Sequence, residues 1–522
     1  MIRKLKNSLI LFPFIFSVYP VLALIAHNAA EMDLSQGIRA LIASLGLTLV
    51  VYTVLLALIR SPIKTALITA LLMLLFYSYG HVNFLSRTWM IFGFSIGRHR
   101  SLIPLYIISF VLVAWLILRS HRDLIPLTRF LNAFGVVLLI FPIYQLSAYE
   151  VNAYYAENEQ AEAVTSNANV SLPENRSSPD IYYILVDGYP RSDFINQYFD
   201  SDNTEFLESL EVRGFYVAHC SQTNYTDTRF SMASTLNMVY LDDGSQLSEV
   251  VHPGSTLDSM IHSSTVQKNF TDLGYSIVTF ESGYKWLRWE NPDLHLDPAL
   301  ERSKRKFMNI GINDFEKLLL DTTATKIIID LPFVLNPEKA KKLEEIINSP
   351  RASHRDRVLY TLNTLPEIPE TITGPKFIYA HIIFPHPPFI VDAEGDFLRN
   401  SPPDEVPAYA DQITYLNTRL IEIVETLIES SDPDPIIILQ SDHGATIDYE
   451  GLNIDKSQRL GILNAYYLPG NAVSELDSTI TPVNTFRIIF DKLFNGDYGR
   501  IEDKSIIGRQ SPFTTIDCTP IE

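Results

Sequence analysis

The chain has 522 residues, 47% of them hydrophobic, and carries 41 Lys and Arg against 60 Asp and Glu. The length exceeds that of one small domain, and the net charge of −19 argues against nucleic acid as a partner. The acidic residues are unevenly placed, because residues 1–149 hold only 3 of them. Two parts of different character are therefore expected.

The first part, residues 1–149, is predicted to be a transmembrane domain of five helices. Five segments are apolar enough and long enough to cross a bilayer, and they lie near residues 8–27, 37–59, 63–80, 102–118 and 128–148. The connections on one side carry the basic residues Arg3, Lys4, Lys6, Arg60, Lys64, Arg119, Arg122 and Arg129. The positive-inside rule makes that side cytoplasmic, so everything after residue 150 is expected outside the cytoplasm.

Residues 150–179 are polar and read as a linker, and residues 180–522 form the predicted exported domain. There, short apolar segments alternate with amphipathic ones. Strands are predicted at 181–186, 214–220, 275–282, 376–384 and 435–440, and helices at 204–214 and 410–430. This alternation predicts an α/β domain with a mostly parallel sheet covered on both faces. Ligands of such sheets bind beyond the carboxyl ends of the strands.

Acidic and histidine side chains follow the apolar runs of three of these strands: Asp187 follows 181–186, His381 and His386 follow 376–380, and Asp442 and His443 follow 435–440. The carboxyl ends of parallel strands share one edge, so we expect these side chains in one crevice. Asp187, Asp442 and His443 would supply three metal ligands of a type that suits zinc or manganese. For each residue taken alone, a structural role at a strand end is the alternative.

A nucleophile is offered by the segment TNYTDTRFSMASTLNM, residues 223–238, whose hydroxyl-bearing residues are followed by a predicted helix through Leu236 and Met238. A hydroxyl at a helix N-terminus lies where backbone N–H groups stabilise a phosphoryl or sulfuryl anion. Ordinary N-capping is the alternative. The segment HIIFPHPPF, residues 381–389, reads as a rigid proline-bearing loop whose histidines can donate protons and hold anionic oxygens, or as a plain surface turn.

Taken together, ILVDG, TRFSMA, SDHG and HIIFPHPPF resemble segments of the sulfatase-like branch of the alkaline phosphatase superfamily. The likeness is nearer to its membrane transferases, namely phosphoethanolamine transferases, phosphoglycerol transferases and lipoteichoic acid synthases. The resemblance implies a bacterial inner or plasma membrane, with the α/β domain periplasmic or otherwise extracytoplasmic. It also covers essentially the whole chain.

Carried over to this chain, the resemblance makes Thr228 the nucleophile and a metal ligand beside Asp187, Asp442 and His443. His381 and His386 would act on the donor or acceptor phosphate. Ser231 and Arg459 are the candidates for substrate contact, and Thr226 and Ser231 remain rivals of Thr228 as nucleophile.

Three departures from the family pattern limit these expectations. Asp187 stands where the membrane transferases usually place Glu, and no histidine follows His443, so one divalent metal is expected rather than two. The C/S-x-P/A-x-R pattern of true sulfatases is absent, which argues against a sulfate-ester hydrolase of the usual kind.

The resulting hypothesis is a metal-dependent membrane transferase that moves a phospholipid head group, of the phosphoethanolamine or phosphoglycerol type, through a covalent Thr228 intermediate. Its partners would be a membrane phospholipid donor and an envelope glycan or lipid acceptor. The alternatives are a sulfatase-like phosphate or sulfate ester hydrolase and a non-catalytic glycan-binding membrane protein. Cys220 and Cys518 both lie in the exported part, where a disulfide persists, but sequence leaves their pairing open.

Overall fold

The structure is a computed structural model that describes residues 9–87, 89–91, 94–95, 97–163, 170–172, 178–241, 253–298, 311–330, 343–344, 346–398, 402–470, 472–507 and 518. The chain forms two compact units. The first comprises Met1–Val151 and Asn309–Pro350, and the second comprises Asn152–Met308 and Arg351–Glu522. The first unit therefore takes up a segment that lies far along the sequence. The basic residues Arg3, Lys4 and Lys6 lie outside the described residues.

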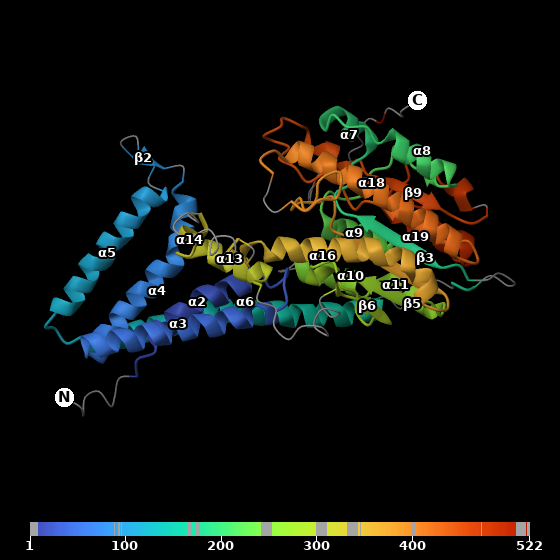
Figure 1. Ribbon diagram of the computed structural model, residues 1–522. Helices are drawn as coiled ribbons and strands as arrows, with labels where there is room; N and C mark the ends of the chain where they lie inside the picture. Colours follow the sequence, from blue (N-terminus) through green and yellow to red (C-terminus); the bar gives the residue numbers. More distant parts are fainter. Residues whose placement is uncertain are drawn as a thin grey trace. The chain divides into compact units, whose positions relative to one another are not determined.

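The first unit is helical (Figure 1). Its elements are α2 (Phe12–His27), α3 (Ser35–Ile59), α4 (Pro62–Leu85), β1 (Met90–Ile91), β2 (Phe94–Ser95), α5 (His99–Arg119), α6 (Ile125–Ala163), α13 (Asp314–Thr322) and α14 (Lys326–Asp330). The helices α3, α4, α5 and residues 125–155 of α6 are each long and apolar enough to cross a membrane. They correspond to the second to fifth predicted spans. α2 corresponds to the predicted first span but has only 16 residues, fewer than the roughly 20 that a spanning helix uses.

The spanning helices differ in how much of their surface the protein covers. α4 is 56% buried over its most apolar window, whereas α3, α5 and α6 are each 11% buried. Large apolar side chains such as Ile42, Val111 and Ile140 are more than half exposed. A surface of this kind is stable in contact with lipid and not in contact with water. The chain is therefore an integral membrane protein.

Helix α13 packs on the spanning helices of its unit. Phe315 and Leu319 are buried in a cluster that includes Ile25 and Met73. A capping box of Asn313 and Glu316 begins the helix.

Polar contacts hold the same helix in place. The Glu316 carboxylate also accepts both Nε and Nη2 of Arg39, and the Ala324 N–H donates to the Phe76 carbonyl of α4 at 2.8 Å. Gly80 of α4 allows the close approach, because a Cβ there would lie 2.2 Å from the Asp321 carbonyl oxygen.

The second unit is built on a seven-stranded sheet with the order β4-β9-β8-β3-β7-β5-β6. Its strands are β3 (Ile181–Val186), β4 (Tyr216–Val217), β5 (Ser276–Phe280), β6 (Leu294–Leu296), β7 (Lys376–Ile382), β8 (Ile436–Gln440) and β9 (Asn464–Tyr467). β8, β3, β7, β5 and β6 pair in parallel, while β9 runs antiparallel to β8 and β4. The predicted mostly parallel sheet is thus confirmed. The predicted strand at 214–220 is shorter in the structure, and the segment 458–470 contributes β9.

Helices cover both faces of this sheet, which explains why its central strand is apolar throughout. Tyr182, Ile184 and Val186 of β3 face one core, and the alternate residues Ile181, Tyr183 and Leu185 face the other. The first core is closed by α7 (Ser192–Tyr198), α8 (Thr204–Val212), α16 (Ser349–Thr364), α17 (Ile368–Thr371) and α18 (Glu405–Ser430). The second is closed by α9 (Thr228–Asn237), α10 (Pro253–His262), α11 (Thr265–Asp272) and α19 (Thr485–Leu493). Short 3-10 turns complete the unit: η1 (Lys285–Leu287), η3 (Leu365–Glu367), η4 (Lys456–Leu460), η5 (Ala472–Glu475) and η6 (Pro482–Asn484).

Cys220 and Cys518 form a disulfide across a sequence separation of 298 residues, which settles the pairing that sequence left open. The bond fastens a residue near the end of the chain to the segment that follows β4. It closes a long loop, a constraint that lowers the entropy of the unfolded chain.

The packing of α13 on α4 predicts a strong effect of a single methyl group. We expect Gly80→Ala to lower the stability of the full-length protein in detergent by about 1–3 kcal/mol, because the new Cβ overlaps backbone atoms that cannot rotate away. Gly46→Ala on α3 is the matched control, since no atom of the described residues lies within 4 Å of its Cβ position. Thermal unfolding followed by intrinsic fluorescence measures both. Equal melting temperatures of the two variants would contradict the close packing at Gly80.

Candidate metal centre

The carboxyl ends of β8, β3 and β7 meet at one edge of the sheet, because these three strands are adjacent and parallel. Asp187 follows β3 directly, and Asp442 and His443 lie just beyond β8. His381 lies inside β7, one residue before its end, rather than after the strand as predicted. His386 follows in the proline-bearing loop. The structure therefore brings together the strand-end residues that the sequence singled out.

Asp187, Asp442 and His443 form a compact buried group. One oxygen or nitrogen atom of each lies within 4.8 Å of the others, and none of the three side chains is more than 6% exposed. Asp187 Oδ1 and Asp442 Oδ2 are buried, and neither has a hydrogen-bond partner among the residues that the structure describes. Two such carboxylate oxygens beside each other are unstable unless a cation is bound between them. The donor set therefore fits a divalent metal ion, in the chemistry of Asp and His ligands.

The backbone around these side chains orients them. The Gly188 N–H donates to Asp442 Oδ1 at 3.1 Å, and the Asp187 N–H donates to the Ile382 carbonyl at 3.0 Å. Nδ1 of His443 donates to the Gly444 carbonyl at 2.7 Å, which leaves the lone pair on Nε2. That nitrogen lies 3.4 Å from Asp442 Oδ2 and 3.7 Å from Asp187 Oδ1. A neutral imidazole held this way is a ready metal ligand.

Electrostatics agree with this assignment of charges. Burial raises the pKa of Asp187, but the histidines around it, His386 first among them, bring it below the usual range. Burial lowers the pKa of His443 below its ordinary value, more than the charge of Asp442 raises it. The carboxylate is thus ionised and the imidazole neutral at neutral pH, as metal binding requires.

Thr228 is the hydroxyl that reaches this group. It is the first residue of α9, which Asp227 caps by accepting the Arg229 N–H at 3.1 Å. Its Oγ1 lies 3.0 Å from His443 Nε2. The rival Ser231 instead lies with its Oγ 3.1 Å from Thr223 Oγ1. Among the described residues, Thr226 makes no hydrogen bond to the three ligand side chains.

His381 and His386 flank the Asp187 side of the group. His381 Nε2 is 3.6 Å from Asp187 Oδ2 and has no hydrogen-bond partner within the part of the chain that the structure describes. The backbone N–H of His386 donates to the Asp187 carbonyl at 3.1 Å, and its ring Nδ1 donates to the Pro387 carbonyl at 2.5 Å. The His386 ring is partly exposed, so a substrate can reach it.

Arg459 also contacts His443. Its Nη2 is 3.1 Å from His443 Nε2 and 3.3 Å from Thr446 Oγ1. Gly444 makes room for this segment, because a Cβ at that position would lie 2.8 Å from the Arg459 carbonyl oxygen. A guanidinium next to the ligand atoms adds positive charge where an anionic substrate group would sit.

Two residues at this edge were missed by the sequence analysis. Glu281 follows β5 just as Asp187 follows β3, so the strand-end rule, applied evenly, would have found it. Burial raises the pKa of Glu281, but a hydrogen bond from His295 and the charge of Arg288 bring it to about 2. His354 of α16 is 6% exposed, and no sequence signal marks it, because it lies in a polar helix with no strand before it.

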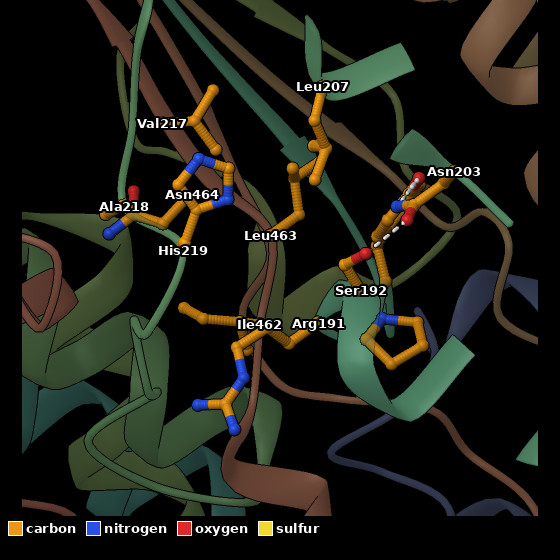
Figure 2. A pocket seen from close by; sticks show the side chains of 12 residues that line it. Arg191, Ser192, Asn203, Leu207, Val217, Ala218, His219, Ile462, Leu463 and Asn464 are labelled. Carbon is orange, nitrogen blue, oxygen red and sulfur yellow. Dashed lines mark hydrogen bonds between the residues drawn. The ribbon is translucent and has the colours of Figure 1, made fainter. Parts of the chain in front are cut away.

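A separate small cavity lies near β9 and α7, as Figure 2 shows. It is lined in part by Arg191, Asn203, His219 and Asn464, and by none of the metal-site residues. The arginine that lines this cavity, Arg191, already pairs with the Asp193 carboxylate through both Nε and Nη2. The metal centre is thus distinct from this cavity.

Three solved structures of bacterial proteins show a distant likeness to this chain. The C-terminal periplasmic domain of EcEptC from Escherichia coli in complex with Zn has a TM-score of 0.40 and 10% identity, over 63% of this chain and 86% of its own. Lipooligosaccharide phosphoethanolamine transferase A from Neisseria meningitidis, an integral membrane protein, has a TM-score of 0.37 and 12% identity, over 92% of this chain and 95% of its own. Lipoteichoic acid synthase LtaP from Listeria monocytogenes has a TM-score of 0.35 and 13% identity, over 58% of this chain and 70% of its own. Likeness at this level does not establish what this chain binds or acts on.

No curated protein matches the sequence. The family model described as Sulfatase matches residues 179–483, which include every strand and every candidate ligand of the second unit. That match extends over more than half of the chain. The chain belongs to the sulfatase family, a branch of the alkaline phosphatase superfamily.

Proposed function

We propose that this protein is a membrane transferase that moves a phospholipid head group, of the phosphoethanolamine or phosphoglycerol type, to an envelope glycan or lipid. The observation that carries the proposal is the position of Thr228. Its hydroxyl lies at the N-terminus of α9 and 3.0 Å from a buried His443 whose neighbours are two carboxylates. The membrane unit supports it further, since a protein in the bilayer meets a lipid donor in the same two dimensions.

Asp187, Asp442, His443 and Thr228 would hold one divalent metal, zinc or manganese. When bound, such an ion lowers the pKa of a hydroxyl and neutralises charge on a phosphoryl group. Thr228 stands at the N-terminus of α9, where the helix dipole favours an anion. Arg459 would bind a non-bridging oxygen of the substrate, and Ser231 would support the nucleophile segment from the next turn.

Transfer would proceed in two displacements at phosphorus. Thr228 Oγ1 forms a bond to phosphorus as the bond to the diglyceride oxygen breaks, and the Thr228 proton leaves to solvent. His386, with His381 behind it, supplies the proton that the diglyceride oxygen takes up. The acceptor hydroxyl then attacks the phosphothreonine and returns its proton to the histidine. Thr228 leaves with the bonding electron pair and regains a proton from solvent.

The proposal places five spans in the membrane, with α2 as the first, and the second unit outside the cytoplasm. The basic residues Arg60, Lys64 and Arg129 lie at one end of their helices and support this orientation. The Cys220–Cys518 disulfide supports it independently, since such bonds persist in oxidising compartments.

The nucleophile assignment predicts an adduct on one residue. Protein purified from its own membranes should carry a phosphoethanolamine- or phosphoglycerol-sized mass that Thr228→Ala lacks and Thr226→Ala retains. Intact-mass spectrometry measures this, and turnover should be abolished in Thr228→Ala alone. An adduct that persists in Thr228→Ala would contradict the assignment, and turnover without any acceptor would indicate a hydrolase.

The ligand assignment predicts metal content. We expect about one metal per wild-type chain and at least roughly tenfold weaker binding in Asp442→Asn and in His443→Gln. Glu450→Gln, an exposed acid paired with Lys456, is the control. Elemental analysis after dialysis measures the content. In the metal-free state Asp442→Asn should melt above wild type, because it removes one of two facing carboxylates; a lower melting temperature would argue against that repulsion.

The orientation predicts that the disulfide forms in living cells. Cells lysed in denaturant with N-ethylmaleimide should yield a chain with no alkylated cysteine, and with two after prior reduction. The control is Cys518→Ser, in which Cys220 is alkylated without reduction. Two alkylated cysteines in the unreduced wild type would place the second unit in a reducing compartment.

A further inference from the structure

Helix α16 carries three basic side chains at three-residue spacing, namely Arg351, His354 and Arg357. Residues three apart on a helix lie on neighbouring turns of one side. The residue between them, Arg355, differs in its contacts. It pairs with Asp356 at 3.0 Å and its guanidinium lies 4.3 Å from the centre of the Phe397 ring. Arg355 is therefore satisfied by protein groups and does not belong to the set.

Arg351 and Arg357 contact two loops at the carboxyl edge of the sheet. Arg351 Nη1 donates to the Phe389 carbonyl, which follows the loop of His386. The Arg357 guanidinium lies against Gly283 beyond β5, so closely that a Cβ there would be 2.7 Å from its Nη2. β5 and β7 are paired neighbours in the sheet. The set thus borders the same edge as the metal centre, beside its histidine loop.

Electrostatics place His354 near that loop as well. Burial lowers the pKa of His354 to about 3, and the positive charges of Arg357 and His386 act in the same direction, while Asp187 opposes them. These influences come from the loop after β7 and from the metal centre itself. The imidazole of His354 is accordingly neutral at physiological pH and can donate one hydrogen bond.

Two nitrogen atoms of the set are buried and lack acceptors. His354 is 6% exposed, and its Nε2 has no hydrogen-bond partner among the described residues. Arg357 Nε is in the same state, while Arg357 Nη1 donates to Ser353 Oγ at 3.1 Å. The nearby Glu281 is already paired with Arg288 and His295. A buried donor without an acceptor is destabilising, so two on neighbouring turns of one helix indicate an anionic ligand.

We propose that His354 and Arg357 form an oxyanion subsite beside the metal centre, which holds a second phosphate-type group of the substrate. The inference rests on the proposed function and deepens it: the substrate carries two anionic groups, one that reacts at Thr228 and one that α16 binds. A planar guanidinium suits such a group, because its N–H donors match two oxygens at once.

Binding of inorganic phosphate to the full-length protein in detergent tests the subsite. Equilibrium dialysis with labelled phosphate is carried out on metal-free and zinc-loaded samples. The metal-free wild type should bind one phosphate per chain, and the zinc-loaded protein two. The double variant His354→Gln, Arg357→Gln should lose the metal-free binding by at least tenfold and keep one phosphate when zinc-loaded. Arg355→Gln, which removes the same charge from the same helix, should behave as wild type.

Arg357→Lys adds a second test that does not depend on the double variant. This variant keeps the positive charge but loses the paired N–H donors of the guanidinium. It should weaken phosphate binding to the metal-free protein about tenfold, while the zinc content stays unchanged. Zinc content also reports that each variant is folded at the metal centre.

The subsite is overturned if the metal-free wild type binds no phosphate, or if the double variant binds as tightly as Arg355→Gln. A different result would contradict the proposed function and leave the subsite standing: the metal-free protein binds one phosphate, and loading with zinc adds no second one. Nanodiscs with and without phosphatidic acid distinguish the source of the anion. Displacement of phosphate by phosphatidic acid supports a subsite for a lipid phosphate, and unchanged binding supports one for a phosphate on the glycan or another soluble group.

Discussion

Two buried carboxylates that face one imidazole impose the strictest constraint on the second unit. Asp187, Asp442 and His443 lie within 4.8 Å of one another where water cannot solvate them. Their positions follow from parallel pairing, because β3 lies between β7 and β8 and the register aligns Leu185 with both His381 and Gln440. A shift of one residue in either ladder would turn these side chains to the other face of the sheet. The buried apolar strands therefore hold the polar group together.

Helix ends and loops around Asp187, Asp442 and His443 bring further groups to them. Thr228 reaches them only because α9 begins where it does, and the start of α9 is set by the Asp227 cap. Gly444 lets the backbone of Arg459 and Gly461 approach at distances that a Cβ would prevent, and at Gly188 a Cβ would lie 2.7 Å from the Tyr409 hydroxyl. The unit therefore combines a rigid frame of strands with helix ends and loops that bring hydroxyl and basic groups to its edge.

Much of this was predictable from local sequence. A strand that ends in an acid is a local signal, so ILVDG and SDHG led to Asp187, Asp442 and His443, and the alternation of strands and helices led to the parallel sheet. The structure also places Thr228 at the group, although the sequence left Thr226 and Ser231 as rivals.

Other features depend on contacts that no local pattern encodes. The position of His354 near the sheet edge results from the packing of α16, which the local sequence does not reveal. The pairing of Cys220 with Cys518 spans 298 residues. The docking of α13 is the clearest case. Its Asn313–Glu316 capping box predicts where the helix begins, but nothing near it predicts that Phe315 packs with Ile25.

That docking changes how the second unit is attached to the first. The chain leaves the first unit after Val151, returns to it at Asn309 and leaves again after Pro350. Three covalent crossings therefore join the two units, where a simple anchor followed by a catalytic domain would have one. A single cut by a protease, at any of the three, leaves the units connected by the remaining chain. A single cut therefore cannot release the second unit, whereas it would release a domain that hangs from one linker.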